Sequence, residues 1–281
     1  KVAVIGAGPA GLTVAGDLAR QGFHVTIFEG QPEAGGVLMY GIPEYRLPKA
    51  VVRNEIKKIE DLGVHFVRNC LVGTPESGVT VDSLFAEGFD AIFMGTGTAL
   101  PQNLSIPGSD LRRVTQSTDF LHNVNAYVEG ALPMEMVPLR KGDKVAVIGG
   151  GNVAMDAVRT ARRLGAEATI VYRRSEKELP ARAEEVHHAK EEGILFRMLT
   201  NPVEVLGDER GWVRGVRCVE MELGEPDASG RRRPIAIEGS EFVLDVDTVI
   251  MALGTSPNPL IRSTTPGLDT NRKGGLIVDE N

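Results

Sequence analysis

Cysteine is scarce in this chain, which has two, Cys70 and Cys218, in no CxxC pair and no metal-ligand spacing. That excludes a disulfide-stapled fold and favours a reducing, cytoplasmic setting. No apolar run approaches the roughly 18 residues that span a bilayer, so no membrane partner is expected. Positive charge is in deficit, and the net charge of −7 argues against a nucleic-acid partner. What remains is an ordinary globular composition, with enough residues for two domains.

One stretch is present twice, and both copies are typical of dinucleotide sites. Lys1–Gly6 and Lys144–Gly149 have the same sequence, an apolar strand that runs into glycines and then a helix pattern. In the Rossmann fingerprint one glycine makes the turn, a second lets the backbone approach a pyrophosphate, and a third small residue lets helix and strand pack closely. The helix N-terminus favours the phosphates. These positions are Gly6, Gly8 and Gly11 in the first copy, and Gly149, Gly151 and Ala154 in the second.

Two features after the first copy indicate how a nucleotide would be held. Glu29 ends the second strand, where a carboxylate can accept hydrogen bonds from ribose hydroxyls; the alternative is a solvated glutamate. The segment 35–48 is rich in glycine and proline but carries large apolar residues and two tyrosines, whereas a bare linker would be polar. Such a backbone suits contact with a flat ring system, and the alternative is an ordered surface loop.

A later pair of strands extends the repeat over whole domains. Residues 90–98 align with residues 247–255, and each is an apolar strand that ends in small residues. The first of the two strands, residues 91–94, is expected to be buried. Gly97 and Gly254 would let the chain leave the sheet where a ligand or the other domain comes close. We therefore expect two related α/β domains with parallel sheets, and the short alternating runs between 196 and 244 predict a small β-meander.

The two copies differ in charge at one equivalent position. Glu29 lies 23 residues after Gly6, and Tyr172 lies 23 residues after Gly149, followed by Arg173 and Arg174. A ribose 2′-phosphate needs a cationic partner and is repelled by a carboxylate. The first site should therefore hold a ribose with free hydroxyls and the second a 2′-phosphorylated one. The alternative for the two arginines is a solvated sheet edge.

With these features the chain resembles the FAD/NADPH part of the glutamate synthase small (β) subunit and its relatives. Those include the large subunit of NADH-dependent ferredoxin–NADP oxidoreductase, sulfide dehydrogenase and the electron-entry half of dihydropyrimidine dehydrogenase. The motifs that carry the resemblance are residues 35–49, residues 149–156 and Leu179-Pro-Ala-Arg182, and it covers essentially the whole chain.

The resemblance implies a fold and a set of cofactor contacts. It implies two Rossmann-like, glutathione reductase-like domains, with an NADPH domain (113–256) inserted into a discontinuous FAD domain (1–112 plus 257–281). FAD would be contacted by Gly6, Gly8, Pro9, Ala10, Gly11, Glu29, Gly36, Leu38, Arg46 and Val72. NADPH would be contacted by Gly149, Gly151, Asn152, Val153, Arg173 and Arg174, with Gly97 and Gly254 near the cleft between domains.

The implied activity is hydride transfer from NADPH to FAD, with electrons leaving through iron–sulfur centres to a partner subunit or domain. The chemistry belongs to the cofactors, so no catalytic side chain and no metal ligand is assigned. The absence of CxxC after Gly151 argues against a dithiol reductase. Two alternatives stay open: a self-contained flavin oxidoreductase acting on a small organic substrate, and a catalytically silent binding module.

The ends of the chain suggest a piece of a longer protein. It begins inside a strand without Met and ends in what looks like another strand, residues 275–278. The family carries an N-terminal cysteine-rich region with iron–sulfur clusters, for which this sequence has no ligands. The family also carries a Gly-Asp flavin motif after a strand like the last one here. We therefore expect the NADPH site to be more complete in this chain than the FAD site.

Overall fold

The computed structural model describes residues 1–226 and 230–279, and the chain divides into two compact units. Unit 1 comprises Lys1–Leu100 and Thr255–Asn281, and unit 2 comprises Pro101–Gly254. The first division lies before residue 101, where the sequence placed it after 112, because Leu104, Ile106 and Leu111 pack against the core of unit 2. No helix among the described residues is long and apolar enough to cross a membrane.

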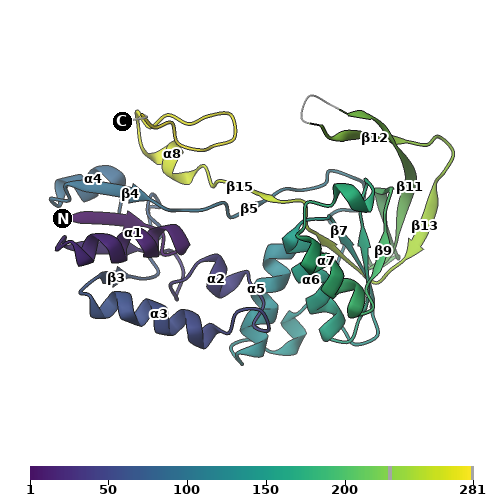
Figure 1. The fold of residues 1–281 in the computed structure, drawn as a ribbon, viewed down its shortest axis with the longest axis horizontal. Coiled ribbons are helices and arrows are strands. Elements are labelled where there is room, and N and C mark those ends of the chain that lie inside the picture. The colour runs from purple at the N-terminus through teal and green to yellow at the C-terminus, as the bar shows by residue number, and fades with distance from the viewer. Residues whose placement is uncertain (227–229, 280–281) are drawn as a thin grey trace. The chain divides into compact units, whose positions relative to one another are not determined.

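Unit 1 is built on a four-stranded parallel sheet whose alternate residues feed two apolar layers. Its strand order is β3 (His65–Val67), β2 (Val25–Phe28), β1 (Val2–Ile5), β4 (Ala91–Met94). One face packs on α1 (Pro9–Arg20), α2 (Val37–Tyr40) and α3 (Lys49–Asp61), and the other on α4 (Val81–Ala86) and α8 (Leu260–Thr264) (Figure 1). Val4 points to the first layer and its neighbour Ile5 to the second, as a strand buried on both faces requires.

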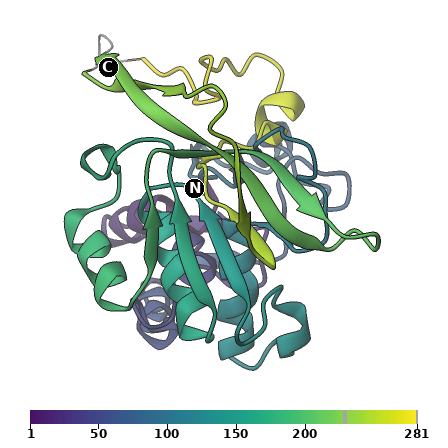
Figure 2. The same cartoon turned by 90° about the vertical axis from the view of Figure 1, so that its right-hand side faces the viewer.

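Unit 2 repeats this plan with a fifth strand and a β-meander. Its parallel sheet has the order β6 (Val114–Gln116), β14 (Thr248–Met251), β7 (Lys144–Ile148), β8 (Glu167–Val171), β9 (Leu195–Arg197). One face carries α5 (Ser117–Val128), α6 (Asn152–Arg163) and α7 (Ala183–Glu191). The other carries β10 (Thr200–Gly207), β11 (Val213–Pro226) and β13 (Phe242–Asp245), with β12 (Arg232–Ala236) pairing the far end of β11 (Figures 1 and 2).

Shorter elements complete the fold. Two 3-10 turns lie in unit 2, η1 (Met134–Met136) and η2 (Glu176–Glu178). Where the chain passes between the units, β5 (Leu100–Pro101) pairs with β15 (Thr255–Ser256).

The internal repeat seen in the sequence is present in three dimensions. The order β3-β2-β1-β4 of unit 1 matches β9-β8-β7-β14 of unit 2, and every neighbouring pair is parallel. The Asp90 N–H donates to the Lys1 carbonyl at 2.9 Å, and the Asp247 N–H donates to the Lys144 carbonyl at 2.8 Å. The expected α/β fold with two parallel sheets and a β-meander is therefore confirmed.

Two sequence-based expectations about strands were wrong. Residues 91–94 form the predicted strand, but Ala91 is exposed and the other three are half-buried, because β4 is the edge strand of its sheet. Residues 275–278 form no strand: Leu276 makes only an isolated bridge to Thr270, and Val278 is 78% exposed. An apolar run with no neighbouring strand to pair with does not form a ladder.

Candidate functional site

The first glycine turn is closed against the sheet and open at its second glycine. A Cβ at Gly6, whose φ is +100°, would lie 2.5 Å from the Gly95 carbonyl oxygen. A Cβ at Gly11 would lie 1.9 Å from the Gly6 carbonyl oxygen. At Gly8, by contrast, a Cβ would meet nothing within 4 Å. No side chain caps α1, and Pro9 and Ala10 are exposed, so the first-turn N–H groups border this open space.

Glu29 is buried, so the alternative of a solvated strand-end glutamate does not hold. Only 8% of the residue is exposed. Its Oε2 accepts a hydrogen bond from the Ala7 N–H at 2.7 Å, and its Oε1 accepts one from the Gln31 N–H at 2.8 Å. The carboxylate thus ties the end of β2 to the glycine turn, and each oxygen keeps further acceptor capacity.

The segment 35–48 lies directly on the first glycine turn. The Gly35 N–H donates to the Ala7 carbonyl at 2.8 Å, and a Cβ at Gly36, with φ +52°, would come within 2.9 Å of the Gly8 Cα. The segment contains α2, one turn of helix in which Leu38 is half-buried, and it carries an exposed Arg46 near its end. Only a glycine at position 36 allows this approach.

Val72 is placed differently from the other expected flavin contacts. It is 2% exposed and belongs to the apolar cluster between the sheet, α4 and α8. Its side chain is therefore part of the core, and only its backbone could meet a cofactor.

The second glycine turn has the same construction. Gly149, with φ +144°, would place a Cβ 2.2 Å from the Ala252 carbonyl oxygen, as Gly6 would toward the equivalent Gly95. Gly151 again has nothing within 4 Å, and it precedes α6, which no side chain caps. Gly150 is covered, since a Cβ there would lie 2.6 Å from Leu179 and 2.8 Å from the Tyr172 ring.

The Leu179–Arg182 loop, which the sequence marked only as part of a motif, is fixed to this second turn. The Ala181 N–H donates to the Gly150 carbonyl at 3.1 Å, and the Arg182 N–H donates to Asn152 Oδ1 at 2.9 Å. The Tyr172 hydroxyl donates to the Glu178 carbonyl at 2.8 Å. Asn152 and Val153 remain exposed at the start of α6. The loop therefore lies against one side of the second glycine turn, a position that the spacing of the motif alone did not predict.

Arg173 and Arg174 follow Tyr172 at the end of β8 but have different surroundings. Arg173 is exposed, and its side chain makes no hydrogen bond or ion pair within residues 1–226 and 230–279. Arg174 is half-buried, and its Nε donates to the Arg232 carbonyl in β12 at 2.9 Å. The meander thus holds one guanidinium in place and leaves its neighbour available.

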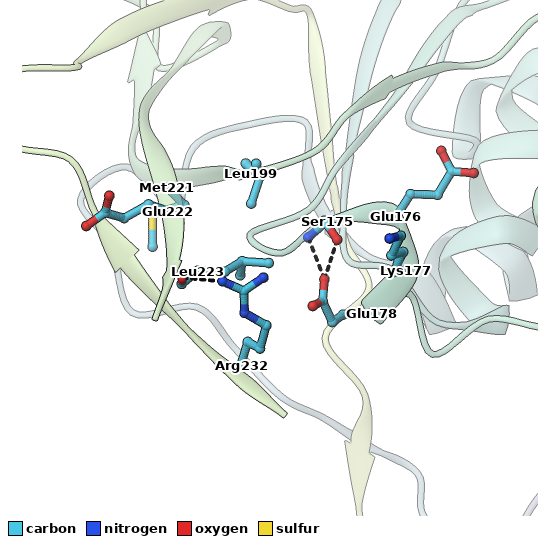
Figure 3. A pocket seen from close by; sticks show the side chains of 9 residues that line it. All are labelled: Ser175, Glu176, Lys177, Glu178, Leu199, Met221, Glu222, Leu223 and Arg232. Atoms are coloured by element: carbon cyan, nitrogen blue, oxygen red, sulfur yellow. Dashed lines mark hydrogen bonds between the residues drawn. The ribbon is translucent and has the colours of Figure 1, made fainter. Parts of the chain in front are cut away.

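An open groove is lined by Ser175, the residue that follows this pair of arginines in the sequence (Figure 3). Glu178 faces Ser175, and its Oε2 accepts from the Ser175 N–H at 3.1 Å. Across the groove, Arg232 lies against Leu223 and donates to its carbonyl oxygen at 2.7 Å. The remaining lining residues are Glu176, Lys177, Leu199, Met221 and Glu222.

Gly97 and Gly254, the last residues in the expected sites, occupy equivalent places after β4 and β14. Both are exposed, with φ of +68° and +103°, and a Cβ on either would meet no atom within 4 Å. A positive φ strains other residue types, so the backbone conformation after each strand favours glycine at these two positions.

A charged cluster holds α7, the helix that directly follows the Leu179–Arg182 loop, against α6. Arg159 is 7% exposed; its Nη1 donates to Glu185 at 2.7 Å and its Nη2 to Glu192 at 2.9 Å. Arg163 donates to the same Glu192 oxygen at 2.9 Å. Burial alone would raise the pKa of Glu192, but the hydrogen bonds and charges of the two arginines outweigh it, so the pKa is lowered from 4.5.

This cluster predicts an acid-sensitive contribution to stability. A lowered carboxyl pKa stabilises the fold above the unfolded-state value of 4.5 and loses that stabilisation as the pH falls below it. We expect Glu192→Gln to cost about 1–3 kcal/mol near neutral pH and less near pH 3. Urea unfolding midpoints measured across that range test this, with exposed Glu209→Gln as control. A cost for Glu192→Gln that is constant with pH would contradict it.

The two cysteines are predicted to be unreactive in the folded protein. Burial raises the pKa of Cys70 and raises that of Cys218 to about 12, and the thiolate is the reactive form. Both are free and they lie in different units. Iodoacetamide should modify less than about a tenth of either thiol before unfolding, and both after it. Rapid alkylation of the native protein, read by mass spectrometry, would show the burial to be wrong.

Three relatives at about two-fifths identity match nearly the whole chain. The NADP(+)-dependent formate dehydrogenase subunit beta of Moorella thermoacetica is 42% identical over 99% of this chain and 38% of its own length. The NADPH-Fe(3+) oxidoreductase subunit beta of Geobacter sulfurreducens is 42% identical over 99% and 40%. The glutamate synthase [NADPH] small chain of Halomonas elongata is 41% identical over 100% and 58%. The chain thus spans between about two fifths and three fifths of the length of these relatives.

Solved structures give the same fold at lower identity. Mycobacterium tuberculosis FprA in complex with NADPH matches with a TM-score of 0.76 at 23% identity, covering 98% of this chain and 74% of FprA. The thioredoxin reductase of T. acidophilum matches with a TM-score of 0.67 at 19% identity, covering 99% of this chain and 84% of that chain. The family model described as pyridine nucleotide-disulphide oxidoreductase matches residues 1–281. The expected likeness to glutamate synthase small chains is confirmed, and the chain belongs to the pyridine nucleotide-disulphide oxidoreductase family.

Proposed function

We propose that unit 1 binds FAD, that unit 2 binds NADPH, and that the protein transfers hydride from NADPH to FAD. The observation that carries this proposal is that the two units share one fold but differ in charge at the end of the second strand. Each unit has an open glycine at an uncapped helix start, Gly8 or Gly151. A buried carboxylate, Glu29, stands where the other unit has Tyr172 and then Arg173.

The residues of unit 1 fit an FAD molecule. Gly8 leaves room for a pyrophosphate beside free N–H groups, and Glu29 has acceptor capacity for ribose hydroxyls. The segment that begins at Gly36 packs on this turn and carries Leu38 and Arg46 as contacts for the ring system. Bound FAD would supply the hydride acceptor, and these residues would orient it.

The residues of unit 2 fit a nucleotide with a 2′-phosphate. Gly151 leaves room for the pyrophosphate, with Asn152 and Val153 at the helix start. Arg173 offers an unshared guanidinium, and Arg174 is held by β12 so that its Nη groups stay available. Arginine can bind a phosphate through two parallel hydrogen bonds, which gives both affinity and orientation.

We further propose that electrons pass from the flavin through iron–sulfur centres to a partner subunit or domain. Three relatives are named as subunits or small chains of oxidoreductases, and two of those names include NADPH. Within residues 1–226 and 230–279 no group of three or more metal-ligating side chains is found, so the proposal places such centres elsewhere. The buried thiols suit the reducing, cytoplasmic setting that we propose.

An anaerobic titration tests the proposed reaction. Protein reconstituted with FAD should lose its absorbance near about 450 nm when NADPH is added, and NADH should do this at much higher concentration. A protein that holds FAD but is bleached only by an organic substrate would favour the self-contained oxidoreductase. A protein that binds NADPH and never FAD would instead support a silent binding module.

A further inference from the structure

The largest fully buried side chain in the described residues is charged: Lys49, with 1% of its surface exposed. Lysine is almost never fully buried unless its ammonium is paired. Lys49 is the first residue of α3, directly after the segment 35–48. A buried lysine at this place needs a physical reason.

The ammonium of Lys49 is bound by backbone carbonyls of the segment that precedes it. Its Nζ donates to the carbonyl oxygens of Leu38 at 3.0 Å, of Ile42, and of Leu47 at 3.3 Å. An ammonium has three protons, and three carbonyls of the segment 35–48 accept hydrogen bonds from it. The Lys49 backbone N–H donates to Glu44 Oε2 at 2.9 Å, which adds a fourth tie to the same segment.

These hydrogen bonds fix the part of the backbone that carries the residues that we expect to face the flavin. Leu38 is itself one of the acceptors, and Arg46 lies between the other two, Ile42 and Leu47. At its other end the segment is fixed by Gly35, through its bond to Ala7, and by the approach of Gly36 to Gly8. The segment has one turn of helix and no strand ladder, so these anchors replace regular secondary structure in setting its shape.

We propose that Lys49 is a positioning residue for FAD, an inference that rests on the proposed function of unit 1. The ammonium does not reach the cofactor, since the protein covers it. It holds the backbone from Leu38 to Leu47 in the conformation that lies along the ring system. Hydrogen bonds from a charged donor are stronger than neutral ones, and a buried carbonyl left without its donor loses that stabilisation.

Lys49→Met tests this, because methionine has a similar length and no donor. We expect the FAD dissociation constant to rise at least about tenfold and the visible flavin spectrum to shift. The NADPH dissociation constant, which reports on unit 2, should stay within about twofold. Lys57→Met, on the exposed side of α3 where Lys57 forms an ion pair with Asp61, is the matched control and should resemble wild type.

The outcomes separate this inference from the proposed function. Wild-type protein that binds no FAD would overturn both. Wild-type protein that binds FAD, with Lys49→Met equal to it in affinity and spectrum, would overturn the role of Lys49 alone. If Lys49→Met does not fold, Lys49→Gln decides: its neutral amide has two donor protons for the three carbonyls. A weakened, spectrally altered FAD site in that variant supports the inference, and wild-type behaviour overturns it.

Discussion

Replacing Arg173 by glutamate is expected to raise the dissociation constant for NADPH by about 100-fold or more and to change that for NADH by less than about threefold. The 2′-phosphate is the only group that distinguishes the two nucleotides. A charged hydrogen bond of this kind is worth about 1.5–3 kcal/mol, and the new carboxylate adds repulsion. Isothermal titration of both nucleotides measures the effect.

The control for this variant is another exposed arginine of unit 2. Arg210 lies in the turn between β10 and β11, and Arg210→Glu makes the same change in net charge. Its effect on NADPH should be small, because only long-range electrostatics would act and salt screens them. Equal losses for NADPH and NADH at Arg173→Glu, or equal losses in the two variants, would contradict the assignment of the 2′-phosphate.

Replacing Gly151 by valine is expected to abolish measurable NADPH binding with little loss of stability. Gly151 has φ −87° and open space around its missing Cβ, so the protein accommodates the side chain. A pyrophosphate that approaches the backbone there would collide with it. We expect at least about a 100-fold weaker complex and less than about 1 kcal/mol of destabilisation.

The neighbouring Gly149 should behave in the opposite way. Gly149→Val forces a side chain toward the Ala252 carbonyl oxygen at a φ of +144°, so several kcal/mol of stability should be lost. In unit 1, Gly8→Val should weaken FAD binding with little loss of stability, as Gly151→Val does for NADPH. Gly6→Val should lower stability, as Gly149→Val does. Thermal unfolding and nucleotide titration on all four variants measure this. If Gly151→Val binds NADPH normally, the open space at that glycine is not a phosphate site.

The features of the protein that the sequence predicted depend on short spacings along the chain. The strand, the glycine turn and the helix of each unit follow one another within about 20 residues, and the charge at residues 29 and 172–174 is counted from the same glycine. Local patterns of this kind need no knowledge of distant contacts. The second pair of strands, residues 90–98 and 247–255, is likewise evident from the sequence, because the two stretches share one local pattern.

What the sequence did not predict depends on contacts between distant residues. In the sequence, Tyr172 mattered only because it stands where the first unit has an acidic residue. In the structure its ring also covers Gly150. Lys49 had no marked role, because lysine is ordinarily exposed and three carbonyl acceptors cannot be read from spacing. The structure divides the units before residue 101, because Leu104 and Leu111 pack on unit 2, and such packing is decided by tertiary contacts.

The central claim is that the two copies bind different nucleotides, FAD in unit 1 and NADPH in unit 2. A crystal structure of the protein grown with FAD and NADP+ tests it most directly. We predict the FAD pyrophosphate over Gly8 with a ribose hydroxyl on Glu29, and the NADP+ 2′-phosphate within hydrogen-bond distance of Arg173. Density for NADP+ at Gly8, or for FAD at Gly151, would contradict the claim.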